Sequence, residues 1–154
     1  MKFFSFLLGL VFSCSLYAQD NWKDVVVVED LEVYVDTLSI EYKDNYYYAW
    51  VKTVYLTENS QSAYVDKIRK SYKKQDEKLE KKLKKWDGFK YNISYRMYDC
   101  LNKRYKVLEV TDYSANGKKI IKTKPNKNNV RWLNVGTDTM GDYTLFFICD
   151  FDSK

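Results

Sequence analysis

The first eighteen residues, "MKFFSFLLGLVFSCSLYA", determine the compartment in which the rest of the chain folds. They carry one charge, on Lys2, followed by an apolar run and then by small residues. The apolar run is too short to cross a hydrocarbon core of ~30 Å as a helix. This layout is typical of a secretory signal peptide cleaved between Ala18 and Gln19, and it fits better than a buried N-terminal helix. We therefore predict that residues 1–18 are removed and that residues 19–154 form the exported protein.

Cys14 opens an alternative processing route. The sequence "LVFSC" loosely resembles a bacterial lipobox, in which a small residue such as Ser13 precedes the cysteine, although Phe12 is bulkier than usual there. In that route Cys14 becomes the lipidated first residue, whereas cleavage after Ala18 removes it. We favour cleavage after Ala18 and keep lipidation of Cys14 as the alternative.

The composition is that of a strand-rich globular domain. Hydrophobic residues make up 45% of the chain and aromatic residues 18%, which is enough for a packed core. Fifteen tyrosines with five glycines and one proline argue against disorder or a repeat fold. Abundant Tyr and Val with little Ala favour strands. The length after residue 18 suits one domain, and no later stretch predicts a membrane span.

The first half of the chain is predicted to contain strands. "DVVVVEDLEVYVDTLSIEY" (24–42) is typical of short strands, and "NYYYAWVKTVYLT" (45–57) is typical of a longer one. Alternation along the longer strand places residues 46, 48, 50 and 52 on one face and residues 47, 49, 51 and 53 on the other. Both faces are largely apolar, which predicts a central strand covered on both sides. Tyr46, Tyr47 and Tyr48 also suit a binding surface, but we favour a role in covering the sheet.

Residues 61–86, "QSAYVDKIRKSYKKQDEKLEKKLKKW", change to a helical periodicity. Their apolar residues recur at spacings of three, four and seven, which predicts one amphipathic helix with a narrow apolar stripe. Asp87-Gly88 is predicted to end this helix. The stripe consists of Val65, Ile68, Tyr72, Leu79, Leu83 and Trp86.

The second half returns to strands and ends in a predicted helix. Two strands, 89–100 and 103–114, precede Asn116-Gly117, which is a strong signal for a hairpin turn. The tail has β-like residues, but Thr139 lies three residues before Asp142, which is typical of a helix N-terminus with an acid in its first turn. We therefore predict a C-terminal helix.

The lysine-rich segment carries most of the excess charge. Residues 66–86 hold ten basic and four acidic side chains, while the formal net charge of the whole chain is +5. One interpretation is a solvated helix face. The other is attachment to anionic lipid, lipopolysaccharide or an acidic host surface, which fits an exported protein better than nucleic acid does. The candidate residues for such a surface are Lys67, Lys70, Lys74, Lys78, Lys81 and Lys85.

The sequence offers little for catalysis. It contains no histidine, which is the commonest general base and metal ligand. A zinc site would need more thiolates than the exported chain provides, and no P-loop, GxSxG or dinucleotide fingerprint occurs. Acidic pairs such as Glu29-Asp30 and Asp76-Glu77 are usually solvated. We therefore expect a protein that is not an enzyme, with no catalytic residue, metal or cofactor.

Cys100 and Cys149 are the two cysteines that remain once Cys14 is removed. Two cysteines in an oxidising compartment usually pair. In the chain-entropy model, a bridge closing about fifty residues stabilises a fold by roughly 4 kcal/mol. The alternative is two buried free thiols.

A set of short motifs is spread over much of the chain: "AWVK" (49–52), "YDC" (98–100), "KRYKVLEVTDYSANGK" (103–118), Trp132, Val135, "TDT" (137–139), Gly141-Asp142 and Cys149. In these motifs the chain resembles the surface-adhesin protein E family of small exported Gram-negative bacterial proteins. Thr137-Asp138 stands where that family has Pro-Gly, so the geometry of this turn is open, and the basic helix is longer than is typical.

The resemblance implies an antiparallel sheet with a C-terminal helix tethered to it by a Cys100–Cys149 disulfide. The family's namesake is an outer-membrane lipoprotein that binds extracellular-matrix proteins. This implies adhesion at a surface, although no binding residue carries over.

Together these patterns predict one α+β domain, residues 19–154. It has an antiparallel sheet of about six strands, a C-terminal helix tethered by a disulfide, and the basic amphipathic helix 61–86 as an insertion. We expect an adhesin-like binding protein of the periplasm, outer-membrane surface or extracellular space, able to form oligomers and not spanning the membrane. Its expected partners are matrix or envelope proteins, anionic lipid or polysaccharide. The alternative is a periplasmic structural or accessory protein without a host ligand.

Overall fold

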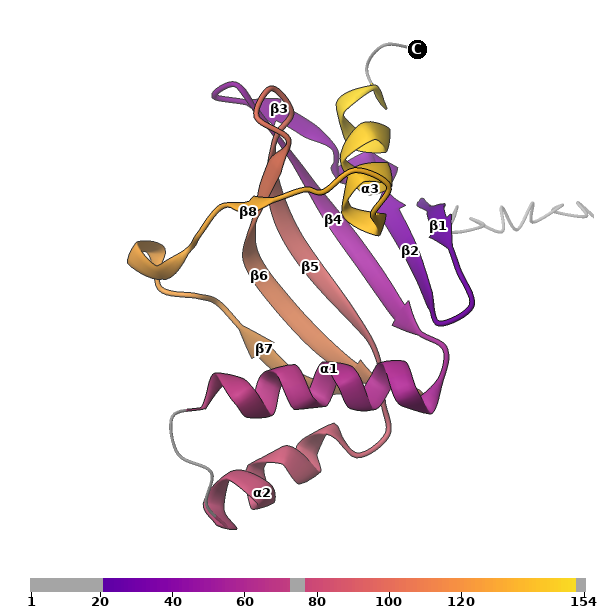
Figure 1. Ribbon diagram of the computed structural model, residues 1–154, viewed down its shortest axis with the longest axis vertical. Coiled ribbons are helices and arrows are strands. Elements are labelled where there is room, and N and C mark those ends of the chain that lie inside the picture. Colours follow the sequence, from indigo (N-terminus) through magenta and orange to yellow (C-terminus); the bar gives the residue numbers. More distant parts are fainter. Residues whose placement is uncertain (1–20, 73–76, 152–154) are drawn as a thin grey trace, which may run out of the picture.

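The computed structural model describes residues 21–72 and 77–151, and Figure 1 shows how they are arranged. The signal peptide at 1–18, its cleavage between Ala18 and Gln19, the lipidation of Cys14 and the role of Lys74 concern residues outside these ranges and remain predictions. Within the described ranges, no helix has the length and apolar character needed to cross a membrane.

The strands form one sheet in which all pairings are antiparallel, as predicted. Six strands follow the order β1-β2-β4-β5-β6-β7, while the short β3 pairs with β4 and the short β8 pairs with β6. The central β4, β5 and β6 are the longest and are rich in aromatic and β-branched residues, which favour strands. The strands are β1 (Trp22–Val27), β2 (Leu31–Asp36), β3 (Glu41–Lys43), β4 (Tyr46–Tyr55), β5 (Phe89–Asp99), β6 (Arg104–Ser114), β7 (Lys119–Thr123) and β8 (Leu133–Asn134).

The lysine-rich segment forms two helices, so the prediction of a single helix over 61–86 is wrong. Helix α1 spans Glu58–Ser71, and helix α2 spans Glu77–Leu83 and continues into the 3-10 helix η2, Lys84–Trp86. Thr57 caps α1 in a capping box with Ser60, and Tyr72, with an extended ψ of 134°, ends the helix.

The apolar stripe gives the physical reason for the break. No apolar residue lies between Tyr72 and Leu79. A straight helix rises about 1.5 Å per residue, so it would carry Leu79 and Trp86 away from the sheet that Val65 contacts. Two helices bring both halves of the stripe onto one core.

Two separate cores lie on one face of the sheet, the face toward the viewer in Figure 1. Helix α3 (Met140–Cys149) closes the first core, and the hairpin of α1, α2 and η2 closes the second. The first core contains Leu145 and Ile148 of α3 against Val33, Val35, Ala49, Val51 and Tyr98 of the sheet. The second contains Leu79, Leu83, Trp86 and Phe89, with Tyr64, Val65 and Ile68 beside them.

The C-terminal segment is helical, as predicted. The Thr139 hydroxyl accepts a hydrogen bond from the backbone N–H of Asp142 at 3.2 Å. Asp138 has a φ of 57°, the left-handed conformation that suits the glycine expected there from the family resemblance. A disulfide joins Cys149, at the end of α3, to Cys100, which follows β5, so the predicted pairing is confirmed.

The other face of the sheet differs from the prediction. It carries Tyr48, Trp50 and Lys52 of β4, whose register places Met97, Tyr95 and Ile93 of β5 beside them. Among the described residues no helix packs on this face, so the expectation that β4 is covered on both sides is wrong. Tyrosine and tryptophan combine an apolar ring with a polar tip, and half-buried rings cover the backbone without a second layer.

Candidate anion-binding surface

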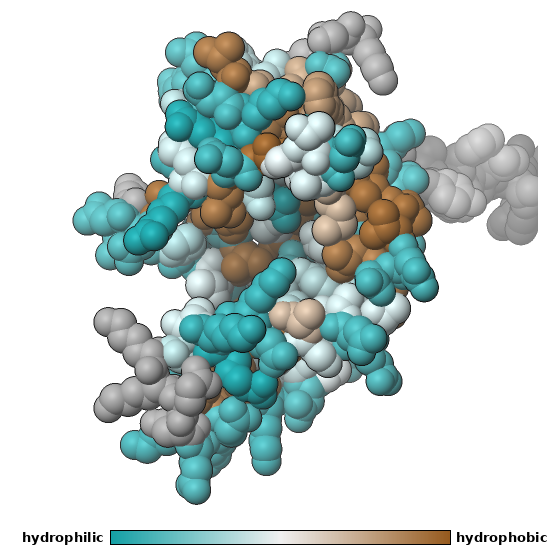
Figure 2. All heavy atoms as spheres, viewed as in Figure 1, coloured by the Kyte–Doolittle hydropathy of each residue, from teal (hydrophilic) through white to brown (hydrophobic). Residues whose placement is uncertain are grey.

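The predicted lysines lie on the hairpin of α1, α2 and η2, at the lower end of Figure 1. Lys67 and Lys70 are on α1, whereas Lys78 and Lys81 are on α2 and Lys85 is on η2. All five are exposed. Figure 2 shows that hydrophilic side chains dominate the surface of this end. The lysines therefore surround a hairpin instead of lining one helix face.

Arg69 forms ion pairs with two of the acidic side chains in the hairpin. Its guanidinium lies 2.5 Å from a carboxylate oxygen of Asp66 on α1 and 3.3 Å from one of Glu80 on α2. The pairs are exposed, so they add little to stability, but they join α1 to α2. Because both acids face Arg69, the exposed lysines keep most of their charge uncompensated.

The buried carboxylate of Asp112 on β6 holds the hairpin against the sheet. It accepts one hydrogen bond from the Tyr64 hydroxyl of α1 and one from the indole N–H of Trp86 in η2, both at 2.7 Å. Burial raises the pKa of Asp112, and the two hydrogen bonds oppose that shift. Burial also raises the pKa of Tyr64, as does the nearby Asp112 carboxylate. This group therefore fixes the position of the lysines, and both oxygens of the carboxylate are occupied.

A cationic cleft of about 370 Å³ lies between η2 and the β6–β7 turn. Lys85 lines it together with Lys118 and Lys119 of the turn, and with Asp87. The turn has the predicted Asn-Gly geometry: Gly117 has a φ of 78°, and its N–H donates to the Ser114 carbonyl at 2.9 Å. Sequence reasoning missed Lys118 and Lys119, which follow the turn signal directly, because only the fold brings them beside Lys85.

Lys67 faces a different region, the hollow between α1 and α3 that Figure 2 shows in the middle of the molecule. This groove of about 270 Å³ lies over the sheet and also receives Arg96 and Tyr105. Lys67 is therefore separated from the cleft at Lys85, and the predicted lysines do not converge on one point.

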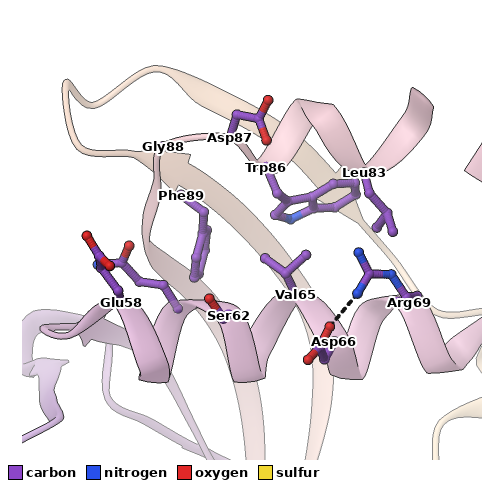
Figure 3. Close-up of a pocket in the computed structure, with 11 residues that line it drawn as sticks. Glu58, Ser62, Val65, Asp66, Arg69, Leu83, Trp86, Asp87, Gly88 and Phe89 are labelled. Atoms are coloured by element: carbon purple, nitrogen blue, oxygen red, sulfur yellow. Dashed lines mark hydrogen bonds and ion pairs between the residues drawn. The ribbon is translucent and has the colours of Figure 1, made fainter. Parts of the chain in front are cut away.

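A third cleft, of about 490 Å³, opens between α1, η2 and the start of β5 (Figure 3). Its floor is apolar, with Val65, Leu83, Trp86 and Phe89 lying together in Figure 3, and these side chains belong to the second core or pack against it. Its rim carries Glu58, Asp66, Asp87 and Arg69, with Asp66 bonded to Arg69. The cleft is thus the place where the second core opens to solvent, and its rim is mainly acidic.

No group of three or more Cys, Asp or Glu side chains among the described residues could hold a metal ion. The chain contains no histidine, and the carboxylate of Asp112, whose pKa is raised by burial, is occupied by Tyr64 and Trp86. What the arrangement can do is present charge and aromatic rings to a partner.

The described residues thus form a disulfide-tethered antiparallel sheet with a strongly charged end. A model of the surface-adhesin protein E family matches residues 22–150, so the chain belongs to that family. Membership makes it an adhesin-like surface protein and confirms the resemblance seen in the sequence. It also implies an exported protein.

The fold is similar to that of protein E of Haemophilus influenzae. One crystal form of that protein matches with a TM-score of 0.50 at 14% identity, over 88% of this chain and 92% of that chain. A second structure of it matches with a TM-score of 0.48 at 13% identity, over 86% of each chain. At this identity the similarity concerns the fold alone. A comparison with curated proteins finds no match.

Proposed function

We propose that this protein is a non-enzymatic adhesin-like protein that attaches to anionic surfaces through the basic end of the molecule. The observation that carries the proposal is the cleft at which Lys85 meets Lys118 and Lys119. Three lysines from two separate segments line it, and Asp87 is the one acid among its lining residues. The exposed Lys78 and Lys81 on α2 extend the same charge toward a flat partner.

Physical chemistry favours a surface over a small ligand here. The lysines are long, exposed and spread over three elements, so they act by long-range attraction instead of enclosing one group. Each lysine near an anionic membrane contributes about 1 kcal/mol, and the attraction falls off within a Debye length of about 8 Å at physiological salt. The hydrogen bonds from Tyr64 and Trp86 to the buried Asp112 hold the hairpin in position, and Asp112 contributes no charge to the exposed surface.

The test is binding of the purified domain to vesicles of phosphatidylglycerol and of phosphatidylcholine, and to laminin and vitronectin coats. We expect binding to the anionic vesicles that weakens as salt rises. Lys85→Gln/Lys119→Gln should weaken it roughly thirty-fold, since two lysines contribute about 1 kcal/mol each. The charge-matched control is Lys23→Gln/Lys43→Gln, at exposed lysines of β1 and β3 away from this end.

Equal loss in both variants would mean that net charge, not this cleft, directs binding. No binding to any member of the panel would favour the alternative of a periplasmic accessory protein. Saturable binding to a matrix coat that survives the lysine changes would move the adhesive site to another part of the molecule.

A further inference from the structure

The sheet face opposite the helices carries an array of aromatic rings in two groups, Tyr48, Trp50 and Tyr95 in one and Tyr91 and Tyr113 in the other. Register places Tyr48 and Trp50 of β4 beside Met97 and Tyr95 of β5, and Lys52 beside Ile93. On the next strand pair, Tyr91 of β5 lies beside Tyr113 of β6. Each of these aromatic side chains is only partly buried, so each ring presents an edge or a face to solvent. No helix of the described residues covers them.

The rings within each group contact one another. The Tyr95 ring lies 5.0 Å from that of Trp50 and 6.0 Å from that of Tyr48, centroid to centroid. The rings of Tyr91 and Tyr113 stack at 4.9 Å with an interplanar angle of 8°. Within the described residues, no hydrogen bond engages the hydroxyls of Tyr48, Tyr91 and Tyr95. The array therefore offers π faces and free hydroxyls together.

Cations are interleaved with these rings. The Lys52 ammonium lies 5.1 Å from the ring centroid of Tyr91 and 5.6 Å from that of Tyr34. In the first residues of β6, the Lys106 ammonium lies 4.3 Å and the Arg104 guanidinium 4.6 Å from the ring centroid of Trp132. Aromatic residues thus hold cations at defined places on this face.

The acids on these strands are already paired. Asp99 receives a hydrogen bond from Arg104 at 2.8 Å, and Glu109 meets Lys122 and Lys124 at 2.5 and 2.9 Å. Lys52 and Lys106 meet no carboxylate among the described residues. Negative charge lies beside this face at Glu41 of β3, in register with Tyr48, and at Glu32 of β2, which accepts a hydrogen bond from the Tyr34 hydroxyl at 2.8 Å. On β4 to β7 themselves the cations of this face outnumber its acids, and Lys52 and Lys106 are left to pair with a ligand's anion.

We propose that this face binds an extended acidic polysaccharide. The apolar C–H face of a sugar ring stacks on tyrosine or tryptophan, its hydroxyls bond to phenol hydroxyls, and its carboxylate or sulfate pairs with an interleaved lysine. Successive same-face residues of a strand are about 7 Å apart, so Tyr48, Trp50 and Lys52 follow the direction of an extended chain. Charge complementarity selects an acidic polymer over a neutral one.

This inference goes beyond the proposed function, because it concerns the opposite face of the sheet and a different set of residues. The test is calorimetric titration with heparin and polygalacturonate oligosaccharides of defined length, with neutral dextran oligosaccharides and a single-stranded oligonucleotide as comparisons. The heparin and polygalacturonate arms distinguish sulfate from carboxylate as the anion. Trp50 and Trp132 lie on this face, so tryptophan fluorescence should change on saturation.

We expect Trp50→Ala to weaken binding of an acidic oligosaccharide roughly tenfold or more, in the range of one lost stacking contact, and Trp50→Phe to restore most of it. Lys52→Gln/Lys106→Gln should also weaken it, whereas the charge-matched pair Lys85→Gln/Lys119→Gln should not. Thermal unfolding of each variant checks that the sheet is intact. The Lys85→Gln/Lys119→Gln variant tests the proposed attachment to anionic surfaces. The polysaccharide inference and the proposed function can therefore fail independently of each other.

Several results would overturn the inference. They are the absence of binding by the unaltered protein, unchanged affinity in Trp50→Ala, equal losses in the two lysine pairs, and equal affinity for dextran. Tighter binding of the oligonucleotide than of either acidic oligosaccharide would overturn the assignment of the occupant.

Discussion

The carboxylate of Asp112 lies 2.7 Å from the indole nitrogen of Trp86, and this hydrogen bond joins the sheet to the end of the lysine-rich hairpin. The same carboxylate accepts the Tyr64 hydroxyl of α1 at 2.7 Å. One buried side chain therefore positions both arms of the hairpin. The charged surface depends on a core contact that carries no surface charge itself.

We expect Asp112→Ala to destabilise the protein by roughly 2 to 4 kcal/mol, because it leaves two buried donors, the Tyr64 hydroxyl and the Trp86 N–H, without an acceptor. The measurement is the free energy of unfolding in urea. A decrease in unfolding free energy below about 1 kcal/mol would show that the two hydrogen bonds to Asp112 contribute little to holding the hairpin against the sheet.

Asp112→Asn removes the charge and keeps one side-chain acceptor oxygen where the carboxylate has two. The folded protein raises the pKa of Asp112 through burial. The favourable contribution of the protonated acid is thus present below the ordinary value near 3.8 and is lost as pH rises through the raised pKa. The asparagine variant lacks this loss, so its stability relative to the unaltered protein should improve from pH 3 to pH 7. A difference that does not vary with pH would contradict the raised pKa.

The parts of the fold that sequence predicted well are those set by local chemistry. Asn116-Gly117 makes the turn that its left-handed Gly117 demands, and Thr139 caps α3 with Asp142 in the first turn. The alternation in β4 predicted which residues share a face. Each of these follows from a few neighbouring residues.

Other features depend on contacts between distant segments, which a sequence pattern does not contain. The end of α1 at Ser71 reflects where Leu79 and Trp86 find a core. Lys118 and Lys119 join Lys85 only through the β6–β7 hairpin. The prediction that the face of β4 with Tyr48 and Trp50 is covered is wrong, because aromatic rings that shield one another give the same alternation in sequence as rings beneath a layer of helices.

The disulfide should be a major source of stability. Replacing Cys100 and Cys149 by serine opens a loop with a sequence separation of 49 residues. The expected cost is roughly 4 kcal/mol in the chain-entropy model. Urea unfolding of the double variant beside the oxidised protein measures it. A cost below about 1 kcal/mol would mean that packing of Leu145 and Ile148 alone anchors α3.

Asp138 provides a test of backbone strain before α3. Its φ of 57° is easy for glycine and costly for a residue with a Cβ. Asp138→Gly should therefore stabilise the protein by about 0.5 kcal/mol or more, and its N–H keeps the bond to the Asp142 carboxylate at 3.1 Å. Asp138→Ala is the matched control and should destabilise it. Lower stability in the glycine variant would indicate that the Asp138 carboxylate makes a contribution larger than the strain.

Glu109 should govern part of the response to acid. Hydrogen bonding to Lys122, supported by Lys124, lowers the pKa of Glu109. The stabilising contribution is therefore present above the ordinary value near 4.5 and is lost as pH falls through the lowered pKa. Both lysines extend into solvent, with 44% and 66% of their side chains exposed, so the contribution should stay below about 1 kcal/mol.

Glu109→Gln should flatten the fall in unfolding free energy between pH 5 and pH 2, while changing stability at pH 7 only slightly. Urea unfolding at a series of pH values measures this slope. Asp24→Asn, at an exposed acid of β1, serves as the control for the loss of one acidic charge. If Glu109→Gln retains the full acid sensitivity of the unaltered protein, the lowered pKa of Glu109 is not its source, and Asp99, whose pKa is lowered by hydrogen bonds from Asn102 and Arg104 against the effect of burial, becomes the acid to test.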